Sequence, residues 1–455
     1  MPLTRKLFTT LFLFFMIPHL YAQEKTEPGL RWNLSDDKSS YAGMSVVNQI
    51  WTRYIENNPD KYGVEQYPDF DLGIRRSRLV FYTYLMDKVF IYTQVGMDGL
   101  TYKSENPIVK LLNAQTEYIF IKDKLHIGFG LHTWNGISRY SNHKLSEFLV
   151  ADHPGFVYPV ENTFDLEGRQ LGIYAKGLLG KMHYRVSVTK PFEYGIDSIS
   201  TPVTTERINE NLAVKGYFSW MFFDRENTLF PYMTMNNLGR QKLFNVGAGF
   251  YYHPEAMLVE AEKDLSTVDP ILAGMLIGAG SEHLLPYFAD YFPSQVSDIF
   301  IAAADVFIDL PLRNKGAVTS YLSYNYNFFG PNYLRSMSKM NVSRMPANKA
   351  LPQGNGNSEW EIGTGHILRG EFGYLLPGTG WKNRLQPFGA FTWKNFEALD
   401  EASFQYDAGL NWFLSGHNIK WTVQYSSRPI YVEADTRNVI DTYKGQIILQ
   451  TQICF

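Results

Sequence analysis

The segment GQIILQTQICF (Gly445–Phe455) decides the fold class, because its side chains alternate in polarity with a period of two. One face is mostly apolar and the other mostly amide: Ile447, Leu449, Thr451, Ile453 and Phe455 against Gln446, Ile448, Gln450, Gln452 and Cys454. A period of two is that of a β-strand. The segment therefore predicts a strand that separates an apolar from a polar environment.

Segments 300–310 and 402–412 show the same alternation. Their more polar faces carry Asp305 and Asp309 in the first segment and Asp407 in the second. Two carboxylates on one side of a strand are costly in a dry core. We therefore expect the polar faces of these strands to be in contact with water.

The composition is that of an ordered, exported chain without disulfides. Of 455 residues, 45% are hydrophobic, 19% charged and 16% aromatic, the formal charge is −3, and Cys454 is the single cysteine. A balanced charge provides no basic surface for nucleic acid. We find no catalytic, nucleotide-binding or metal-binding motif in the sequence, and expect no nucleic-acid partner, no cofactor, no metal and no enzymatic activity.

The first residues are those of a secretory signal. Arg5 and Lys6 precede an apolar run from Leu7 to Leu20, and the small residue Ala22 follows. We expect cleavage after Ala22, a short periplasmic segment over 23–42 and a transmembrane β-barrel over 43–455. No other apolar run approaches the length of a membrane-spanning helix.

Short and long connections alternate between the expected strands. Short ones are expected at 86–88, 122–124, 178–181, 224–227, 253–255, 311–315 and 414–417, and long ones at 134–168, 191–210, 264–298, 329–358 and 429–443. Short turns on one rim and long loops on the other are typical of an outer-membrane barrel. The bacterial outer membrane is thus the expected location.

The expected strands are 43–54, 73–86, 89–98, 113–122, 125–133, 169–178, 181–190, 211–222, 228–236, 241–252, 256–263, 299–310, 316–328, 359–374, 384–394, 402–413, 418–428 and 444–455. Eighteen strands form an even-numbered, closed antiparallel barrel. Segments 228–236, which contains Pro231, and 256–263 have the weakest strand pattern, so sixteen strands is the alternative. Either number leaves an aqueous channel.

Several strings resemble the phosphate-selective porins of the O and P type, in particular their Bacteroidota relatives. They are VVNQIWTRY (46–54), DLGIRRSRLVFYTYL (71–85), RQLGIYAKG (169–177), GPNYLR (330–335) and GLNWFLSGHNIKWTVQYS (409–426). The resemblance implies a general-diffusion or anion-preferring porin, often trimeric, with its third long loop, here 134–168, folded into the lumen. That loop carries more acids than cations, so phosphate specificity is not carried over.

Two arginines are the main candidates for lining the pore. Arg76 and Arg78 share a strand face with Tyr82 and Tyr84. A cation facing lipid costs about 2–4 kcal/mol at the membrane midplane, so both must point into the lumen. They either form a cationic strip that favours anions or pair with carboxylates of the third loop and hold it.

The full set expected to line the pore or its constriction is Arg76, Arg78, Tyr82, Asp98, Glu117, His132, Arg139, Lys144, Glu147, Arg185, Lys215, Asp305, Asp309, Arg369 and Glu371. Cations facing acids across a constriction create a transverse field that penalises apolar solutes. This pattern predicts a sieve with weak ion preference. The aromatic residues Tyr82, Tyr84, Phe90 and Tyr92 provide an alternative, a track on which sugars stack.

The sequence thus predicts a passive porin for small polar or anionic solutes. The expected partners are outer-membrane lipid, two further copies in a homotrimer, and the barrel-assembly machinery, which would recognise Phe455. Two other classes remain open: an outer-membrane barrel enzyme and a secreted all-β carbohydrate-binding protein.

Overall fold

The computed structural model describes residues 29–455 except 61, 103–107, 193–203, 208, 227–229, 260–294, 339, 341–355 and 435–436. The expected signal peptide lies outside the described residues. The strands are β1 (Leu30–Asn33), β2 (Tyr41–Ile55), β3 (Asp69–Leu85), β4 (Val89–Thr101), β5 (Lys110–Ile121), β6 (Leu125–Thr133), β7 (Arg169–Leu179), β8 (Met182–Lys190), β9 (Thr204–Glu206), β10 (Ala213–Met221), β11 (Leu243–Val259), β12 (Gln295–Pro311), β13 (Ala317–Phe328), β14 (Leu334–Met337), β15 (Glu359–Gly363), β16 (Gly365–Leu375), β17 (Arg384–Phe396), β18 (Ser403–Ser415), β19 (Ile419–Ala434) and β20 (Arg437–Cys454). Three short 3-10 helices are η1 (Arg139–Asn142), η2 (Leu145–Glu147) and η3 (Gly155–Val157). Among the described residues no helix is long and apolar enough to cross a membrane.

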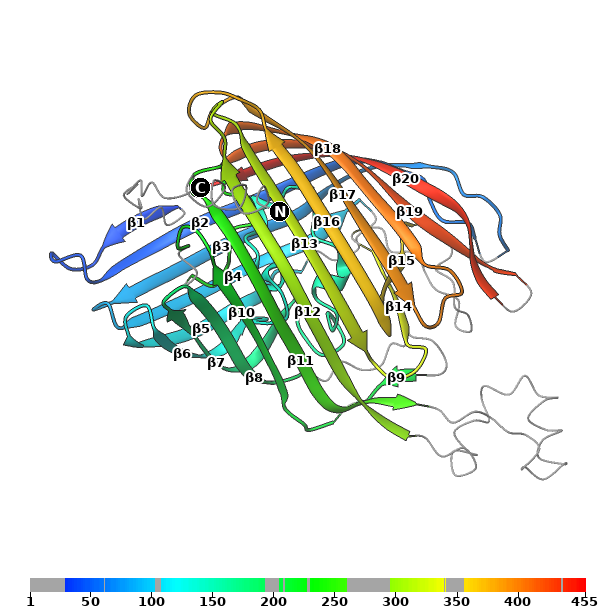
Figure 1. Ribbon diagram of the computed structural model, residues 1–455, viewed down its shortest axis with the longest axis horizontal. Helices are drawn as coiled ribbons and strands as arrows, with labels where there is room; N and C mark the ends of the chain where they lie inside the picture. The colour runs from blue at the N-terminus through cyan, green and yellow to red at the C-terminus, as the bar shows by residue number, and fades with distance from the viewer. Residues whose placement is uncertain are drawn as a thin grey trace, which may run out of the picture.

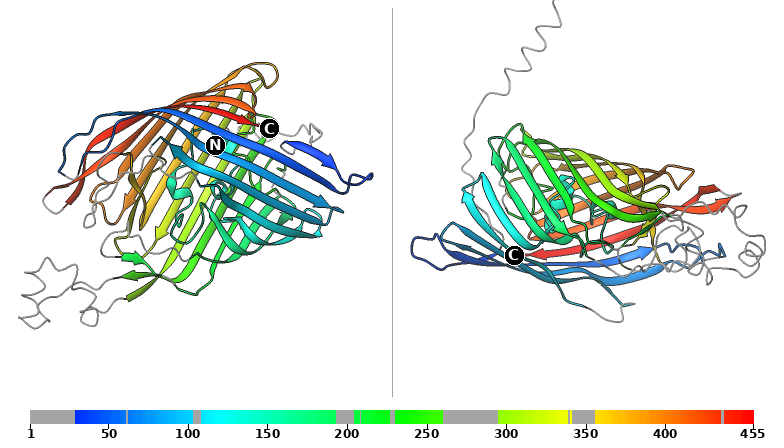
Figure 2. Two further views of the ribbon diagram at one scale, coloured as in Figure 1. Left: turned by 180° about the vertical axis from the view of Figure 1, so that it is seen from behind. Right: turned by 90° about the horizontal axis from the view of Figure 1, so that it is seen from below.

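The strands form a closed antiparallel barrel (Figures 1 and 2). Sixteen of them, β2 to β8, β10 to β13 and β16 to β20, pair with their neighbours in chain order, and β20 pairs with β2 from Val47↔Cys454 to Ile55↔Gln446 to close the ring. Strand β1 pairs with the part of β2 that extends beyond the end of β20. The expected barrel is confirmed.

The barrel has sixteen strands, so the count of eighteen is wrong and the alternative holds. The described part of the expected strand 228–236, residues 230–236, is not a wall strand, because it belongs to the connection between β10, which ends at Met221, and β11, which begins at Leu243; residues 228 and 229 lie outside the described residues. The short connection expected at 224–227 is therefore wrong, because the connection between these two strands runs from Met221 to Leu243. His253–Glu255 is not a turn either, because β11 runs through it to Val259 with a register shift between His253 and Met257.

A second difference concerns the last two strands. The long connection expected at 429–443 is instead mostly strand, since β19 extends to Ala434 and β20 begins at Arg437. Backbone pairing between β19 and β20 thus continues beyond the level at which the neighbouring strand β18 begins. The strand ends next to the other expected long connections lie at the same rim, which we call the long-loop rim. The opposite rim, with the tight turns at 86–88 and 122–124, is the short-turn rim.

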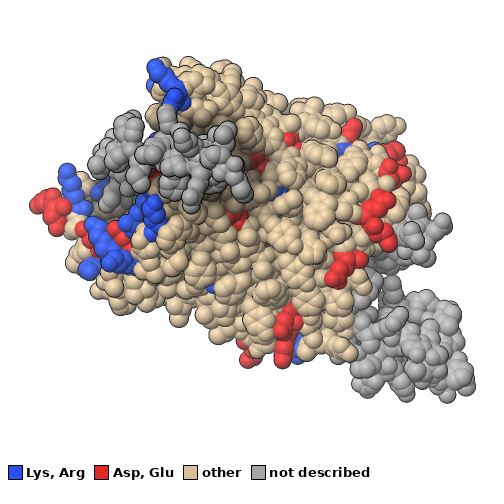
Figure 3. Space-filling model, in the orientation of Figure 1, with Lys and Arg blue, Asp and Glu red and all other residues tan. Residues whose placement is uncertain are grey.

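The wall separates an apolar exterior from a polar interior. Along β20, Ile447, Leu449 and Ile453 are 42–50% exposed on the outside, whereas Gln450 and Gln452 are at most 1% exposed. In Figure 3 charged side chains on the visible face gather toward the two rims, and the middle of the wall is largely uncharged. An uncharged apolar belt of this kind suits contact with hydrocarbon.

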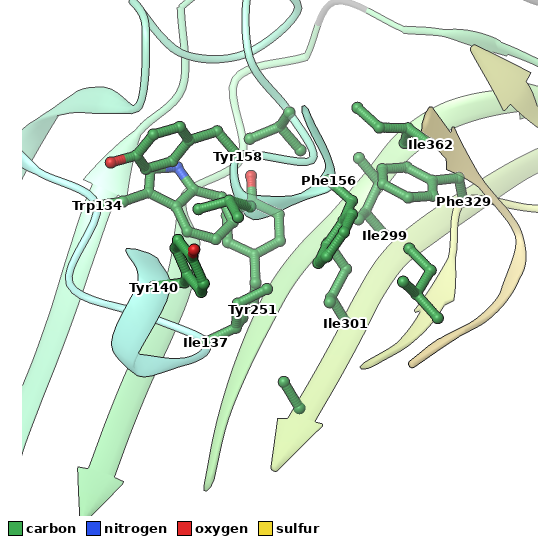
Figure 4. Packing of buried hydrophobic residues seen from close by; sticks show 14 of the residues in the cluster. Trp134, Ile137, Tyr140, Phe156, Tyr158, Tyr251, Ile299, Ile301, Phe329 and Ile362 are labelled. Atoms are coloured by element: carbon green, nitrogen blue, oxygen red, sulfur yellow. The ribbon is translucent and has the colours of Figure 1, made fainter. Parts of the chain in front are cut away.

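The connection from β6 to β7, residues 134–168, lies inside the barrel as expected; we call it the inner loop. Its apolar side chains pack on the wall over β11 and β12, and Figure 4 shows Trp134 and Ile137 near Tyr251, and Phe156 near Ile299 and Ile301. This burial anchors the loop along one side of the lumen.

Polar side chains of the wall bind the backbone of the inner loop on the other side. Gln49 donates to the Leu145 carbonyl (3.1 Å), Gln452 to Ser146 (3.0 Å), Lys420 to Phe148 (3.0 Å) and Asn411 to Leu149 (2.7 Å), and Gln424 accepts from the Ala151 N–H (2.7 Å). Buried backbone groups need such partners. At this level the polar faces contact the loop, and not open water as expected.

A second segment enters the lumen from the short-turn rim. We call residues 230–242 of the β10–β11 connection the rim insert. Its backbone is held by the wall: Arg185 donates to the carbonyls of Phe230 and Pro231 (both 2.7 Å), and Asp309 accepts from the N–H groups of Asn237 and Gly239 (both 2.8 Å).

Candidate pore constriction

Two adjoining cavities lie between the inner loop and the wall. The larger, of about 240 Å³, opens toward the long-loop rim, since Met337 of β14 and Glu359 and Glu361 of β15 line it. The smaller, of about 20 Å³, has room for about one water molecule. Both are lined by Arg75, Asp98, His153, Glu161 and Glu167. We identify the smaller cavity as the candidate constriction.

Asp152 of the inner loop draws two arginines of β3 to the constriction. Its carboxylate lies 2.5 Å from Arg75 Nε and 2.6 Å from Arg76 Nη2. Both arginines point inward although they are consecutive, because the register of β2 against β3 shifts between the pairs Gln49↔Arg76 and Ile50↔Ile74 and leaves Arg75 as the extra residue. Such a bulge redirects a side chain that strict alternation would send outward.

Two further arginines complete the cationic side. Arg78 forms an ion pair with Asp98, and its Nη2 lies 3.5 Å from Glu167 of the inner loop. Arg169, at the start of β7, donates from Nη2 to Gln94 (3.2 Å) and to the Tyr232 hydroxyl (3.1 Å). The four arginines therefore approach the cavity from two parts of the wall, β3 and β7.

The charges at the constriction nearly balance. Arg75, Arg76, Arg78 and Arg169 line it together with Asp98, Glu161 and Glu167, and Asp152 adds a fourth acid. Burial lowers the pKa of His143, a residue of the inner loop, so its ring is neutral near pH 7. Four cations facing four acids produce a strong local field with little net charge, which favours polar over apolar solutes.

Tyr232 of the rim insert closes the constriction on the short-turn side. It is 8% exposed, and its hydroxyl lies 3.0 Å from Gln94 Oε1 and 3.1 Å from Asn113 Oδ1. Its ring packs against Tyr92 with a centroid distance of 6.1 Å. None of these three neighbours belongs to the inner loop.

The aromatic residues considered for sugar stacking do gather inside the barrel, but the rim insert covers them. Phe230 contacts Tyr82, Phe90 and Tyr92 at centroid distances of 5.6–6.0 Å. Tyr82, Phe90 and Tyr92 are at most 1% exposed. In this arrangement the track is occupied by side chains of the chain itself.

The structure divides the fifteen expected pore residues into two groups. Arg76, Arg78, Asp98 and Arg369 line one or both cavities. The remaining ones line neither cavity; they are inward-facing or on the inner loop and take part in packing or hydrogen bonds: Tyr82, Glu117, His132, Arg139, Lys144, Glu147, Arg185, Lys215, Asp305, Asp309 and Glu371.

Several of this second group hold the two lumenal segments. Asp305 accepts from the Arg139 N–H (2.6 Å), and Glu371 accepts from the Tyr140 hydroxyl (2.5 Å), so both fix the inner loop. The pairing of Arg76 and Arg78 with carboxylates of that loop agrees with the second of the two readings given for them.

The expected set lacks six residues that the structure places at the constriction: Arg75, Asp152, Glu161, Glu167, Arg169 and Tyr232. Strict alternation predicts that Arg75 points outward, and the β-bulge that turns it inward cannot be recognised from alternation. Asp152 was only one of several loop acids. Tyr232 lay in a segment assigned to the wall. One signal was present: Pro231 beside it already weakened the strand pattern.

Comparisons with known proteins add solved structures of low similarity. No protein-family profile matches the chain, and no curated protein matches it. The outer membrane channel DcaP of Acinetobacter baumannii aligns with TM-score 0.49 at 12% identity, over 94% of this chain and 100% of that one. OmpF of Salmonella typhi, in complex with daunomycin, aligns with TM-score 0.48 at 9% identity (92% and 99%), and Pseudomonas putida OprB with 0.47 at 9% (92% and 95%). Since these TM-scores are below 0.5, the assignment of the barrel depends on the strand pairing of this structure and not on the comparisons.

Proposed function

We propose that the chain is an outer-membrane porin, a passive diffusion channel for small polar or anionic solutes. The observation that carries the proposal is a closed sixteen-stranded barrel, apolar outside, with a charged constriction and a cavity of about 240 Å³ inside. Barrels of this strand number are wide enough for a water-filled path. The solute gradient alone would drive transport.

The two lumenal segments define the sieve. Polar groups of the wall bind both of these segments, so we infer that the path is narrow and that small solutes pass near the four arginines. Because the charges there nearly balance, the ion preference is weak. Four predictions from the sequence are part of this proposal: membership of the O and P type porin family, a homotrimer, export through the signal peptide, and recognition of Phe455 by the assembly machinery.

Proteoliposome swelling tests this function. Liposomes that contain the purified chain should swell in isotonic solutions of small sugars or amino acids, and the rate should fall steeply as the solute becomes larger. Empty liposomes and liposomes with heat-unfolded chain provide the controls. Equal rates for chain-containing and empty liposomes would contradict the proposal.

A further inference from the structure

Two segments from opposite rims meet inside the barrel. Arg139 of the inner loop forms a bidentate pair with Glu226 of the β10–β11 connection (3.0 and 2.5 Å) and donates from Nε to the Thr234 carbonyl (2.9 Å). Two backbone hydrogen bonds join the segments: Met233 N–H to the Asn142 carbonyl (2.5 Å) and Lys144 N–H to the Met233 carbonyl (3.0 Å).

These contacts fix the residue between them. Tyr232 lies between Pro231, whose carbonyl binds Arg185, and Met233, whose backbone binds the inner loop. Its own ring is held by Tyr92, and its hydroxyl by Arg169, Gln94 and Asn113. A side chain that is restrained at both neighbouring residues and at its hydroxyl group is held in a single position.

We propose that Tyr232 limits the solute path at the arginine constriction from the short-turn side, so that the rim insert sets the width of the pore together with the inner loop. The inference rests on the porin function proposed above. It follows from the position of the ring, which closes a cavity of about 20 Å³ lined by Arg76, Arg78 and Arg169. The ring occupies space through which a solute leaving this cavity toward the short-turn rim would pass.

The hydroxyl has a second effect, on charge. Arg169 Nη2 donates to the Tyr232 oxygen, and this bond keeps the guanidinium turned toward the rim insert. Removal of the hydroxyl alone would free one N–H of Arg169 for a passing anion. The Tyr232 ring thus controls the width of the solute path, and its hydroxyl controls how far the Arg169 guanidinium is available to solutes.

Single-channel recording of two variants separates these effects. Tyr232→Ala should raise the conductance by about twofold or more, because the ring no longer narrows the path. Tyr232→Phe should give a smaller rise and a reversal potential shifted toward anion preference. Tyr324→Ala, on the outer wall where the ring is 44% exposed, removes the same ring without touching the lumen and should leave conductance unchanged.

Three outcomes overturn the inference or its basis. A conducting wild-type chain with equal conductance in Tyr232→Ala would overturn the inference and leave the porin function intact. An equal rise in Tyr324→Ala would also overturn it. Absence of conductance in wild type and in every folded variant would instead overturn the porin function.

A second measurement covers failure of Tyr232→Ala to fold. Tyr232→Cys in a Cys454→Ser background offers one thiol at the constriction. A charged methanethiosulfonate reagent should reduce the current through this variant several-fold and leave the Cys454→Ser parent unaffected. A current that does not change after complete labelling would overturn the inference.

Discussion

Removal of two arginine side chains from the constriction should shift the ion selectivity of the channel toward cations. In the wild type, four arginines face four acids around the smaller cavity. The double variant Arg76→Ala/Arg78→Ala leaves two cations facing four acids, a net change of two charges. At about 4 Å in water each unit charge contributes about 1 kcal/mol to the energy of a passing ion. Two charges give about 2 kcal/mol, and since about 1.4 kcal/mol is tenfold, the cation-to-anion permeability ratio should rise at least about tenfold.

The assay is the reversal potential across a planar bilayer with a salt gradient. The control variant Lys122→Ala/Lys124→Ala removes the same charge from an exposed turn at the short-turn rim and should shift the potential far less, since charges beyond a Debye length of about 10 Å are screened. Heat-modifiable migration on a gel would verify that both variants fold. An unchanged potential in the arginine variant, or an equal shift in the lysine variant, would refute the reasoning and leave the arginines as anchors of the inner loop.

Three further predictions concern the wall and the lumenal segments. Gly249→Ala would place a methyl group 2.2 Å from the Ile137 carbonyl, so the inner loop should be displaced and conductance should rise; identical single-channel traces would contradict this. Asp309→Ala should leave two backbone N–H groups of the rim insert without their acceptor, at about 1–3 kcal/mol each, and should speed limited proteolysis there; wild-type cleavage rates would argue against the anchor. Leu449→Arg should lower the free energy of unfolding in lipid by about 2–4 kcal/mol, because its side chain faces outward; unchanged urea denaturation would place that face away from hydrocarbon.

Alternation along the chain predicted the wall well because one physical constraint acts on every strand: one face meets the apolar exterior and the other meets polar groups. For this reason the faces read from Gly445–Phe455 agree with the exposures of Leu449 and Gln450. The position of the third long loop, 134–168, inside the lumen was implied by the resemblance to the porin family and not by alternation.

The alternation rule failed for segments that do not have the apolar exterior on one face and polar groups on the other. In the expected strand 228–236 the side chains alternate, but its described part, residues 230–236, packs inside the lumen with Phe230 against aromatics of the wall and Tyr232 against the constriction. A local pattern does not distinguish this from a wall strand. At His253–Glu255 a proline beside an acid looked like a turn, whereas the backbone absorbs the irregularity as a register shift within β11.

The site was harder to predict than the fold, because it depends on contacts between residues distant in sequence. Asp152 is 76 positions from Arg76, and Tyr232 is 63 positions from Arg169. Alternation shows that Arg76 faces inward but not which carboxylate it meets. The amides of the wall were likewise read as facing water, when they bind the backbone of the inner loop.

The most direct test of the account is single-channel recording of the purified, folded wild-type chain in a planar bilayer without added ligand. We predict discrete current steps of small, uniform size that appear on insertion and persist at low voltage, since the constriction is polar and narrow. A bilayer that contains folded chain and stays silent at all voltages would contradict a solute path through the barrel.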